Sequence, residues 1–264
     1  TAPTEAGSYD TPGNANGVAV AGDYAYVAAG IGGLRIVDVS DPSAPTEAGS
    51  YDTPGWANGV AVAGNYAYVA DGYSGLRIVD VSDPSAPIEA GFYDTPSWAS
   101  GVAVAGDYAY VADYDSGLRV VDVSDPTAPT EAGSYDTPGN ANGVVVAVAG
   151  DYAYVADDGA GLRIVDVSDP SAPTEAGFYD TPGNANGVAV VGNYAYVADG
   201  VYSGLRIVDA SDPTAPTEAG SYDWPGNANG VAVAGNYVYV ANLDGGLFIL
   251  SFLDNRLYMP LILR

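Results

Sequence analysis

The acidic residues are the main candidates for chemistry in this sequence, because it contains no cysteine and no histidine. Hydrolase triads, thiolate nucleophiles and histidine-ligated zinc need one of those two residues, so these classes of site are excluded. A pair of carboxylates, as in glycoside hydrolysis, is the arrangement that remains. The aspartates, however, recur at equivalent positions: Asp38, Asp80, Asp122, Asp166 and Asp209 form one set, and Asp41, Asp83, Asp125, Asp169 and Asp212 form another. Because residues copied into nearly every repeat favour a structural role, we predict no catalytic residue and a protein that is not an enzyme.

One acidic stretch, Asp113-Tyr114-Asp115, departs from the repeats. Its two carboxylates could bind calcium through hard oxygen ligands, but a calcium loop normally brings more oxygens at regular spacing. Solvated loop acids are the alternative interpretation. The sequence therefore implies no cofactor and no metal ligands, with calcium at this stretch left open.

These residues are carried by a repeat. The phrase Gly-Leu-Arg-Ile-Val-Asp and its variants place a leucine at Leu34, Leu76, Leu118, Leu162, Leu205 and Leu247, at spacings of 42, 42, 44, 43 and 42 residues. A fixed period in this range is typical of architectures in which each unit buries its apolar face against copies of itself.

Each repeat contains four strand-length segments. In the first copy these are residues 17–21 (GVAVA), 24–28 (YAYVA), 34–39 (LRIVDV) and 45–51 (PTEAGSY), and none has a helical period. Gly22-Asp23 supplies the positive φ of a tight hairpin, and Ser40-Asp41-Pro42 supplies a second turn. Four antiparallel strands in about 42 residues is the length of a β-propeller blade.

Six such units predict an all-β six-bladed β-propeller of four-stranded antiparallel blades, forming a single domain over residues 1–253. The chain begins with a fourth strand, and its last repeat supplies only three. We therefore expect residues 1–10 to give the outer strand of the last blade and to close the fold, with residues 254–264 as an apolar C-terminal tail. An open solenoid is the alternative, although it would need capping repeats that the sequence lacks.

The six copies differ mainly in two loops, the one before the first strand and the one between the second and third. In an up-and-down blade these loops emerge at the same end, so the differences gather on one face. Loop drift is one explanation. The other is a face that binds ligand through exposed aromatic residues and a neighbouring acid: Trp56, Tyr73, Trp98, Tyr114, Asp115, Tyr202 and Trp224.

A set of asparagines precedes the first strand of most blades. We expect these side chains to line the mouth of a central channel, with ordered water as their partner: Asn16, Asn58, Asn142, Asn186 and Asn229.

The charge limits the partners. The chain has 33 acids against seven basic residues, all arginine, and a net charge of -26. A field of that sign repels phosphate backbones and anionic lipids, so we expect no nucleic-acid partner. No segment approaches the roughly 18 apolar residues of a membrane span, so we expect no membrane insertion. An unknown protein or glycan remains as partner, and we expect a monomer.

The recurring Leu-Arg-Ile-Val-Asp-Val-Ser-Asp-Pro stretch, with Tyr-Ala-Tyr-Val-Ala before it, resembles the LVIVD-repeat family of bacterial propeller-like surface proteins. The resemblance covers residues 1–253 and implies an extracellular or cell-surface location. It brings no catalytic residue to transfer. The sequence thus favours a non-catalytic binding or scaffold propeller with an unknown ligand. A carboxylate-dependent glycan-active enzyme and a rigid spacer in a larger surface protein are the alternatives.

Overall fold

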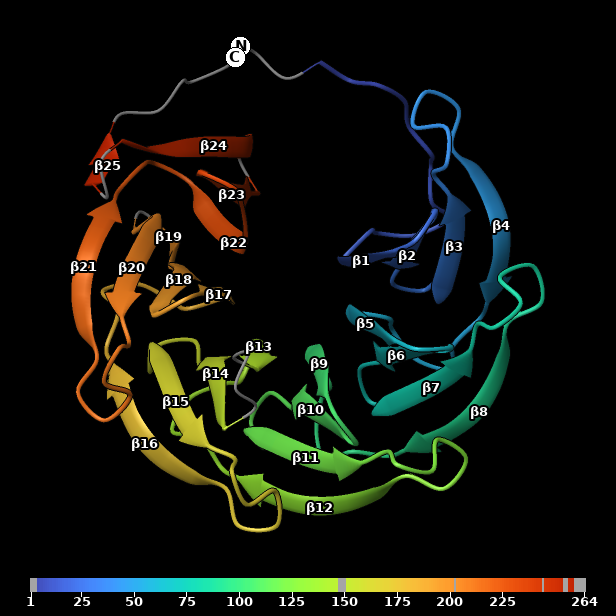
Figure 1. Cartoon of the computed structure of the whole chain (residues 1–264), viewed down its shortest axis with the longest axis horizontal. Helices are drawn as coiled ribbons and strands as arrows, with labels where there is room; N and C mark the ends of the chain where they lie inside the picture. Colours follow the sequence, from blue (N-terminus) through green and yellow to red (C-terminus); the bar gives the residue numbers. More distant parts are fainter. Residues whose placement is uncertain (1–3, 147–150, 202, 244, 254–255, 259–264) are drawn as a thin grey trace. The chain divides into compact units, whose positions relative to one another are not determined.

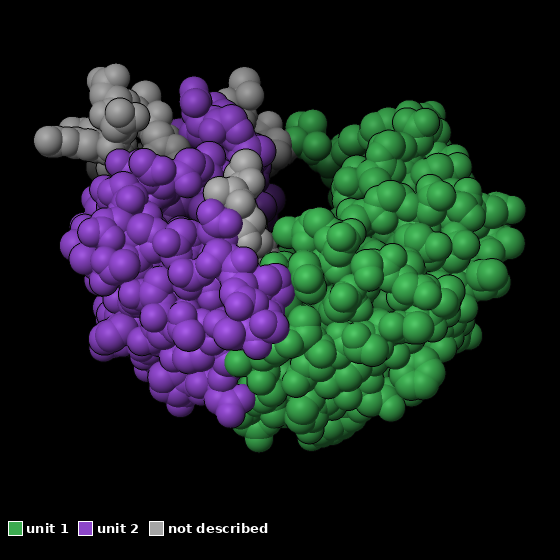
Figure 2. Space-filling model, turned by 60° about the horizontal axis from the view of Figure 1, so that its bottom comes forward, with its two compact units in different colours: residues 1, 3–134 green, residues 2, 135–264 purple. Residues whose placement is uncertain are grey.

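The strands of the molecule gather into six antiparallel sheets. The computed structural model describes residues 4–146, 151–201, 203–243, 245–253 and 256–258, and these residues hold β-strands and turns but no helix (Figure 1). Within that part of the chain there is accordingly no helix able to cross a membrane. The chain divides into two compact units, residues 1 and 3–134 and residues 2 and 135–264, which are coloured separately in Figure 2.

Unit 1 contains blades 1 to 3. Each blade is a sheet of four strands in sequential order. The strands are β1 (Gly17–Ala21), β2 (Tyr24–Ala28), β3 (Leu34–Asp38), β4 (Thr46–Tyr51), β5 (Gly59–Ala63), β6 (Tyr66–Ala70), β7 (Leu76–Asp80), β8 (Ile88–Tyr93), β9 (Gly101–Ala105), β10 (Tyr108–Ala112), β11 (Leu118–Asp122) and β12 (Thr130–Tyr135), which ends at the unit boundary.

Unit 2 contains blades 4 to 6. Its strands are β13 (Gly143–Val146), β14 (Tyr152–Ala156), β15 (Leu162–Asp166), β16 (Thr174–Tyr179), β17 (Gly187–Val191), β18 (Tyr194–Ala198), β19 (Gly200–Val201), β20 (Leu205–Asp209), β21 (Thr217–Tyr222), β22 (Asn227–Ala234), β23 (Tyr237–Asn242), β24 (Gly246–Leu253) and β25 (Arg256–Tyr258). Blade 5 runs β17-β18-β20-β21, and the sheet of blade 6 runs β19-β22-β23-β24-β25. The predicted fold class is confirmed: the chain is an all-β six-bladed propeller of four-stranded antiparallel blades. The single domain over residues 1–253 stays a prediction.

The core lies between consecutive blades of a unit. Leu34 and Ile36 on one face of blade 1 pack with Val69 and Val79 of blade 2, and all four are fully buried. Strict alternation in the central strands sends side chains to both faces, so blade 2 also forms a cluster with blade 3, and blade 5 forms clusters with blades 4 and 6. Fully burying one aliphatic side chain of this size stabilises the fold by about 1.5–3 kcal/mol.

The repeated aspartates of the third strand and the following turn are fixed by local hydrogen bonds. The Ser40 N–H donates to Asp38 Oδ1 at 2.9 Å, and the Ser43 N–H donates to Asp41 Oδ1 at 2.9 Å. Hydrogen bonds from the serine hydroxyl and N–H groups lower the pKa of both carboxyls. The same bonds recur at Asp80, Asp83, Asp122 and Asp125 and their equivalents in blades 4 and 5. These acids therefore serve the turns.

The outer strand of blade 6 differs from the expectation. Residues 4–10 form no strand, and the outer neighbour of β24 is β25, which lies in the segment predicted as a tail. Ser251 pairs with Tyr258 and Leu253 with Arg256. Only two residues separate the strands in sequence, so pairing them requires a much smaller loop closure than joining the two ends of the chain. Closure by residues 1–10 is not confirmed.

The N-terminal segment nevertheless lies against blade 1 as a fourth strand would. The Tyr9 hydroxyl donates to Glu47, just as Tyr51 donates to Glu89 at 3.0 Å and Tyr93 to Glu131 at 2.8 Å. Residues 4–9 thus keep the contact that β4 and β8 make with the blade following each of them.

Candidate functional site

Three variable loops of unit 1 meet at one end of blades 2 and 3. They are the loop between β6 and β7, the segment between β8 and β9, and the loop between β10 and β11. Two main-chain hydrogen bonds join the first two, from Gly72 N–H to Ala99 O at 3.2 Å and from Ala99 N–H to Gly72 O at 3.0 Å. These bonds hold the backbone of the β6–β7 loop against the segment that leads into β9.

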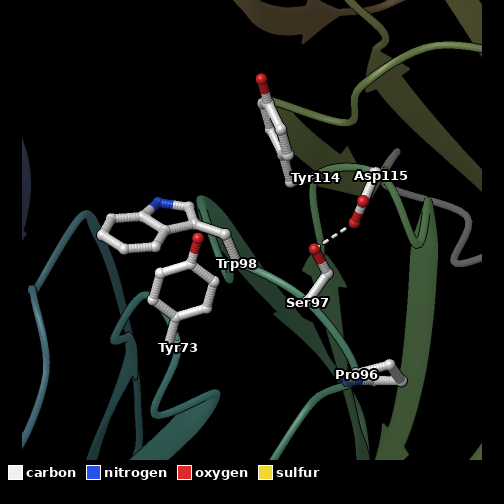
Figure 3. A pocket seen from close by; sticks show the side chains of 6 residues that line it. All are labelled: Tyr73, Pro96, Ser97, Trp98, Tyr114 and Asp115. Atoms are coloured by element: carbon white, nitrogen blue, oxygen red, sulfur yellow. Dashed lines mark hydrogen bonds between the residues drawn. The ribbon is translucent and has the colours of Figure 1, made fainter.

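These loops border an open hollow of about 540 Å³, within the range of small-ligand sites. Its walls are aromatic and its polar groups sit at one side. Figure 3 shows Tyr73 and Trp98 in contact, with Tyr114 standing apart from them on the side of Asp115. The lining residues are Tyr73, Pro96, Ser97, Trp98, Tyr114 and Asp115.

The Trp98 ring is held by its surroundings. Its centroid lies 4.7 Å from that of Tyr73, with the ring planes at 88°, an edge-to-face contact that stabilises by about 0.5–1.5 kcal/mol. The indole also lies over Gly72, where a Cβ would come within 3.1 Å of the ring, so this position needs glycine. Tyr73 is 79% exposed. An exposed aromatic surface is therefore presented in a fixed orientation.

Asp113 holds the segment that carries Trp98. Its carboxylate is fully buried and accepts hydrogen bonds from the Thr95 hydroxyl at 2.6 Å and the Ser97 N–H at 2.9 Å. Arg119 Nε lies 4.0 Å away. Burial raises the pKa of Asp113, while these hydrogen bonds and the arginine charge oppose the rise. Asp113 therefore positions the site without facing the hollow.

Sequence reasoning missed this role. The signal was present, because an aspartate follows the second strand in four of the six copies: Asp71, Asp113, Asp157 and Asp199. All four are fully buried. Their repetition in four copies would have identified them as structural residues.

Tyr114 and Asp115 form the other side of the hollow. Tyr114 has a φ of 47°, a conformation that is unusual for a bulky side chain, and it is 40% exposed. The equivalent residues in blades 1, 2 and 5 are Gly30, Gly72 and Gly200, all with positive φ. Asp115 is exposed and accepts a hydrogen bond from the Ser97 hydroxyl.

The other predicted surface residues separate into three groups. Trp56 is 36% exposed and lies over Gly30, but it does not line the hollow. Trp224 does not belong to an exposed surface: it is 6% exposed and stacks on Phe248, with ring centroids 4.9 Å apart. Its indole packs in the core between blades 5 and 6, which residue type alone did not reveal. Tyr202 lies outside the described residues.

The asparagines before the first strands connect neighbouring blades. Asn16 Nδ2 donates to Ala57 O at 3.1 Å, Asn58 Nδ2 to Ala99 O at 3.0 Å and Asn186 Nδ2 to Ala228 O at 2.9 Å. The Asn142 N–H donates to Ala156 O at 2.9 Å. Asn229 lies in β22. The amides of Asn16, Asn58 and Asn186 thus have main-chain partners, and the channel-mouth role stays a prediction.

No group of three or more acids that could hold a metal ion occurs in the described part of the chain. At the Asp113–Asp115 stretch, the Asp113 carboxylate is already engaged with Thr95 and Ser97.

The sequence repeats decide the family. A family model described as the LVIVD repeat matches six times, at residues 12–53, 54–95, 98–137, 138–181, 182–224 and 225–251. The chain belongs to the LVIVD-repeat family. Among curated proteins, no match was found.

Solved structures share the fold of this LVIVD-repeat protein at low identity. A putative 6-phosphogluconolactonase from Bacteroides fragilis has a TM-score of 0.81 at 12% identity, over 94% of this chain and 83% of that one. The periplasmic gluconolactonase of Pseudomonas aeruginosa has a TM-score of 0.78 at 14% identity, over 94% and 84%. The β-propeller domain of Cps50 (Swd1) from Myceliophteria thermophila has a TM-score of 0.73 at 12% identity, over 90% and 82%. Similarity at this level concerns the fold alone.

Proposed function

We propose that this LVIVD-repeat propeller is a non-catalytic binding module that works outside the cytoplasm, at the cell surface or as an exported protein. Its ligand docks in the hollow formed by Tyr73, Trp98, Tyr114 and Asp115. The observation that carries the proposal is an aromatic pair in which the exposed Tyr73 ring contacts the half-buried Trp98 indole, which lies over Gly72; the ring centroids are 4.7 Å apart and the planes meet at 88°. Fixed aromatic surfaces of this kind are typical of binding sites because little ordering entropy is lost when a ligand docks.

The repeated acids favour binding over catalysis. In blades 1 to 5 the aspartates of the third strand and its turn are engaged by local hydrogen bonds, and Asp71, Asp113, Asp157 and Asp199 are buried. In the hollow the carboxylate is Asp115, with Ser97 beside it. A carboxylate-dependent enzyme would depend on Asp115, which makes the two functions separable.

The test is a screen of the full chain against an oligosaccharide panel and a panel of surface proteins and peptides. Trp98→Ala should abolish the binding that the screen detects and leave the melting temperature nearly unchanged. Trp56→Ala is the matched control, since it removes an equivalent exposed tryptophan one blade earlier and should retain binding. Unchanged binding in Trp98→Ala would overturn the proposal. Turnover of a panel member, lost in Asp115→Asn, would replace it with the enzymatic alternative.

A further inference from the structure

The proposed hollow has the chemistry of a site for cations. We infer that it binds a cationic side chain, the ammonium of lysine or the guanidinium of arginine, presented by a basic partner protein. This inference rests on the proposed function and specifies the ligand of the same hollow. It is argued from the aromatic walls, the polar groups between them, the backbone conformation of Tyr114 and the charge of the chain.

The aromatic walls present π faces in different directions. Tyr73 and Trp98 meet at 88°, so their ring faces point in different directions, and Tyr114 stands apart from them beside the same hollow (Figure 3). The face of an aromatic ring carries partial negative charge and attracts a cation within about 6 Å of the ring centroid, most strongly for tryptophan. Several such faces around one space are the arrangement with which proteins recognise alkylammonium groups.

The polar groups of the hollow favour a ligand that donates hydrogen bonds. The Ser97 hydroxyl already donates its proton to Asp115, so this pair offers acceptor atoms and a negative charge. Ammonium and guanidinium groups have only donors, which match such a pair. A sugar presents hydroxyls that both donate and accept, and among the side chains that line this hollow its donors would be the two tyrosine hydroxyls and the indole N–H of Trp98.

Tyr114 occupies a position that is glycine in blades 1, 2 and 5 and Asp158, with a φ of 49°, in blade 4. Its φ of 47° is one that costs an ordinary L-residue about 1–2 kcal/mol. The side chain is 40% exposed, so tight packing does not account for a tyrosine there. Unfavourable backbone conformations kept without a packing gain are concentrated at functional sites. Its ring provides the third aromatic wall.

The charge of the chain directs cations toward this surface. A net charge of -26 raises the local concentration of cationic partners and repels anionic ones. The fold also places guanidinium groups against aromatic rings elsewhere in the molecule. Arg77 lies 4.4 Å from the ring centroid of Phe92, and Arg163 lies 4.5 Å from that of Phe178. Both rings are about half exposed, so such contacts form at the surface of these blades.

The test uses three probes that differ in charge at constant backbone: N-acetyl-lysine methylamide, N-acetyl-arginine methylamide and the neutral N-acetyl-norleucine methylamide. Binding to the full chain is measured by ligand-observed NMR at low salt. The cationic probes should bind about tenfold more tightly than norleucine. Trp98→Ala should remove that preference, and Trp56→Ala should keep it. Asp115→Asn should weaken the cationic probes severalfold and leave the neutral probe unchanged.

Tyr114→Gly tests the effect of this side chain on binding without a loss of stability. Glycine is the residue of Gly30, Gly72 and Gly200 at the same position, so the melting temperature should stay the same or rise while the cationic probes bind severalfold more weakly. Equal binding of the neutral probe, or of a neutral oligosaccharide, that is lost in Trp98→Ala would overturn the cationic ligand and leave the proposed function standing. Cationic binding that persists in Trp98→Ala would overturn this inference by showing attraction to the acidic surface as a whole.

Discussion

Blades 4 and 6, both in unit 2, fill the same interior position with opposite chemistry. In blade 4, the buried Asp157 accepts hydrogen bonds from the Thr137 hydroxyl at 2.5 Å and the Gly139 N–H at 2.8 Å, and Arg163 Nε lies 3.8 Å away. In blade 6 the residues equivalent to Thr137, Asp157 and Arg163 are Trp224, Asn242 and Phe248. A charged, hydrogen-bonded network is thus replaced as a set by two stacked rings and an amide.

The comparison teaches how irregularities in a repeat can be interpreted. In blade 6, Trp224 and Asn242 are buried and Trp224 stacks on the partly buried Phe248, so packing accounts for them. In blades 2 and 3 the unusual residues Tyr73, Trp98, Tyr114 and Asp115 also gather, but around an exposed hollow. Packing does not require them there, which is why we assign them to ligand binding.

The largest expected effect comes from breaking the aromatic core of blade 6. Trp224→Ala removes a side chain that is 6% exposed and stacked on Phe248. The free energy of unfolding should fall by about 3–5 kcal/mol, because the lost burial is combined with a cavity. Urea unfolding monitored by circular dichroism measures it. Trp56→Ala, at a tryptophan that is 36% exposed, should lower it by less than about 1 kcal/mol. Equal losses in the two variants would contradict this account of blade 6.

A somewhat smaller loss is expected from the charged network of blade 4. Asp157→Ala leaves the Thr137 hydroxyl and the Gly139 N–H without their acceptor and removes a partner of Arg163, so unfolding should become easier by about 3 kcal/mol. Asp180→Ala is the matched control, since Asp180 also contacts Arg163, at 3.3 Å, but is 70% exposed. Its removal should cost less than about 1 kcal/mol.

The same network offers a test of replacement as a set. The triple variant Thr137→Trp, Asp157→Asn, Arg163→Phe carries the residues of blade 6. Because the three side chains contact one another, their effects should be strongly non-additive, and the triple variant should be more stable than the sum of the single changes predicts. If the three single changes in the free energy of unfolding simply add up to that of the triple variant, the three residues of blade 6 do not depend on one another.

The sequence predicted the strands well because their signals are local. Residues 17–21 and 24–28 were expected as strands and are β1 and β2, bounded by a turn in which Gly22 has a φ of 59°. The outer strand of blade 6 was not predicted, because β25 has only three residues and lies in the segment that was assigned to an apolar tail. The Asp254-Asn255 pair before it was the turn signal that could have indicated a strand. Counting the repeats favoured residues 1–10 for this position, and it does not weigh that distant pairing against the short connection between β24 and β25.

The site was predictable only in part. Comparison of the six copies singled out Tyr73, Trp98, Tyr114 and Asp115, which the structure brings together. It also singled out Trp224 by the same reasoning, because the sequence does not show whether a tryptophan is exposed or, as here, stacked on Phe248. Asp113 was considered as a metal ligand, whereas burial and its contacts with Thr95 and Ser97 show a structural role.

The smallest expected effect is a difference in pH dependence between the two blades. Burial raises the pKa of Asp157 above its ordinary value of 3.8, with Thr137, Gly139 and Arg163 opposing the rise. A carboxyl whose pKa is raised by folding binds its proton more readily in the folded state, so its contribution to stability increases as the pH falls through the raised pKa toward 3.8. Asp157→Asn removes this contribution. The stability of the wild type relative to Asp157→Asn should therefore increase between pH 7 and pH 4.

The reverse change in blade 6 should give the complementary result. Asn242 is 4% exposed, and Phe248 stands where blade 4 has an arginine, so Asn242→Asp introduces a buried carboxyl without a cationic partner. The variant should be destabilised at pH 7, and its stability should recover as the pH is lowered toward 4. Urea midpoints of the three proteins across this range measure both effects. The turn aspartates, such as Asp38 and Asp41, have lowered pKa values, so their contribution to stability falls as the pH drops through the acidic range. All three proteins share these residues, so that contribution cancels when their stabilities are compared. A loss of stability in Asn242→Asp that does not depend on pH would contradict this account, because it would show that water solvates the new carboxylate at this position.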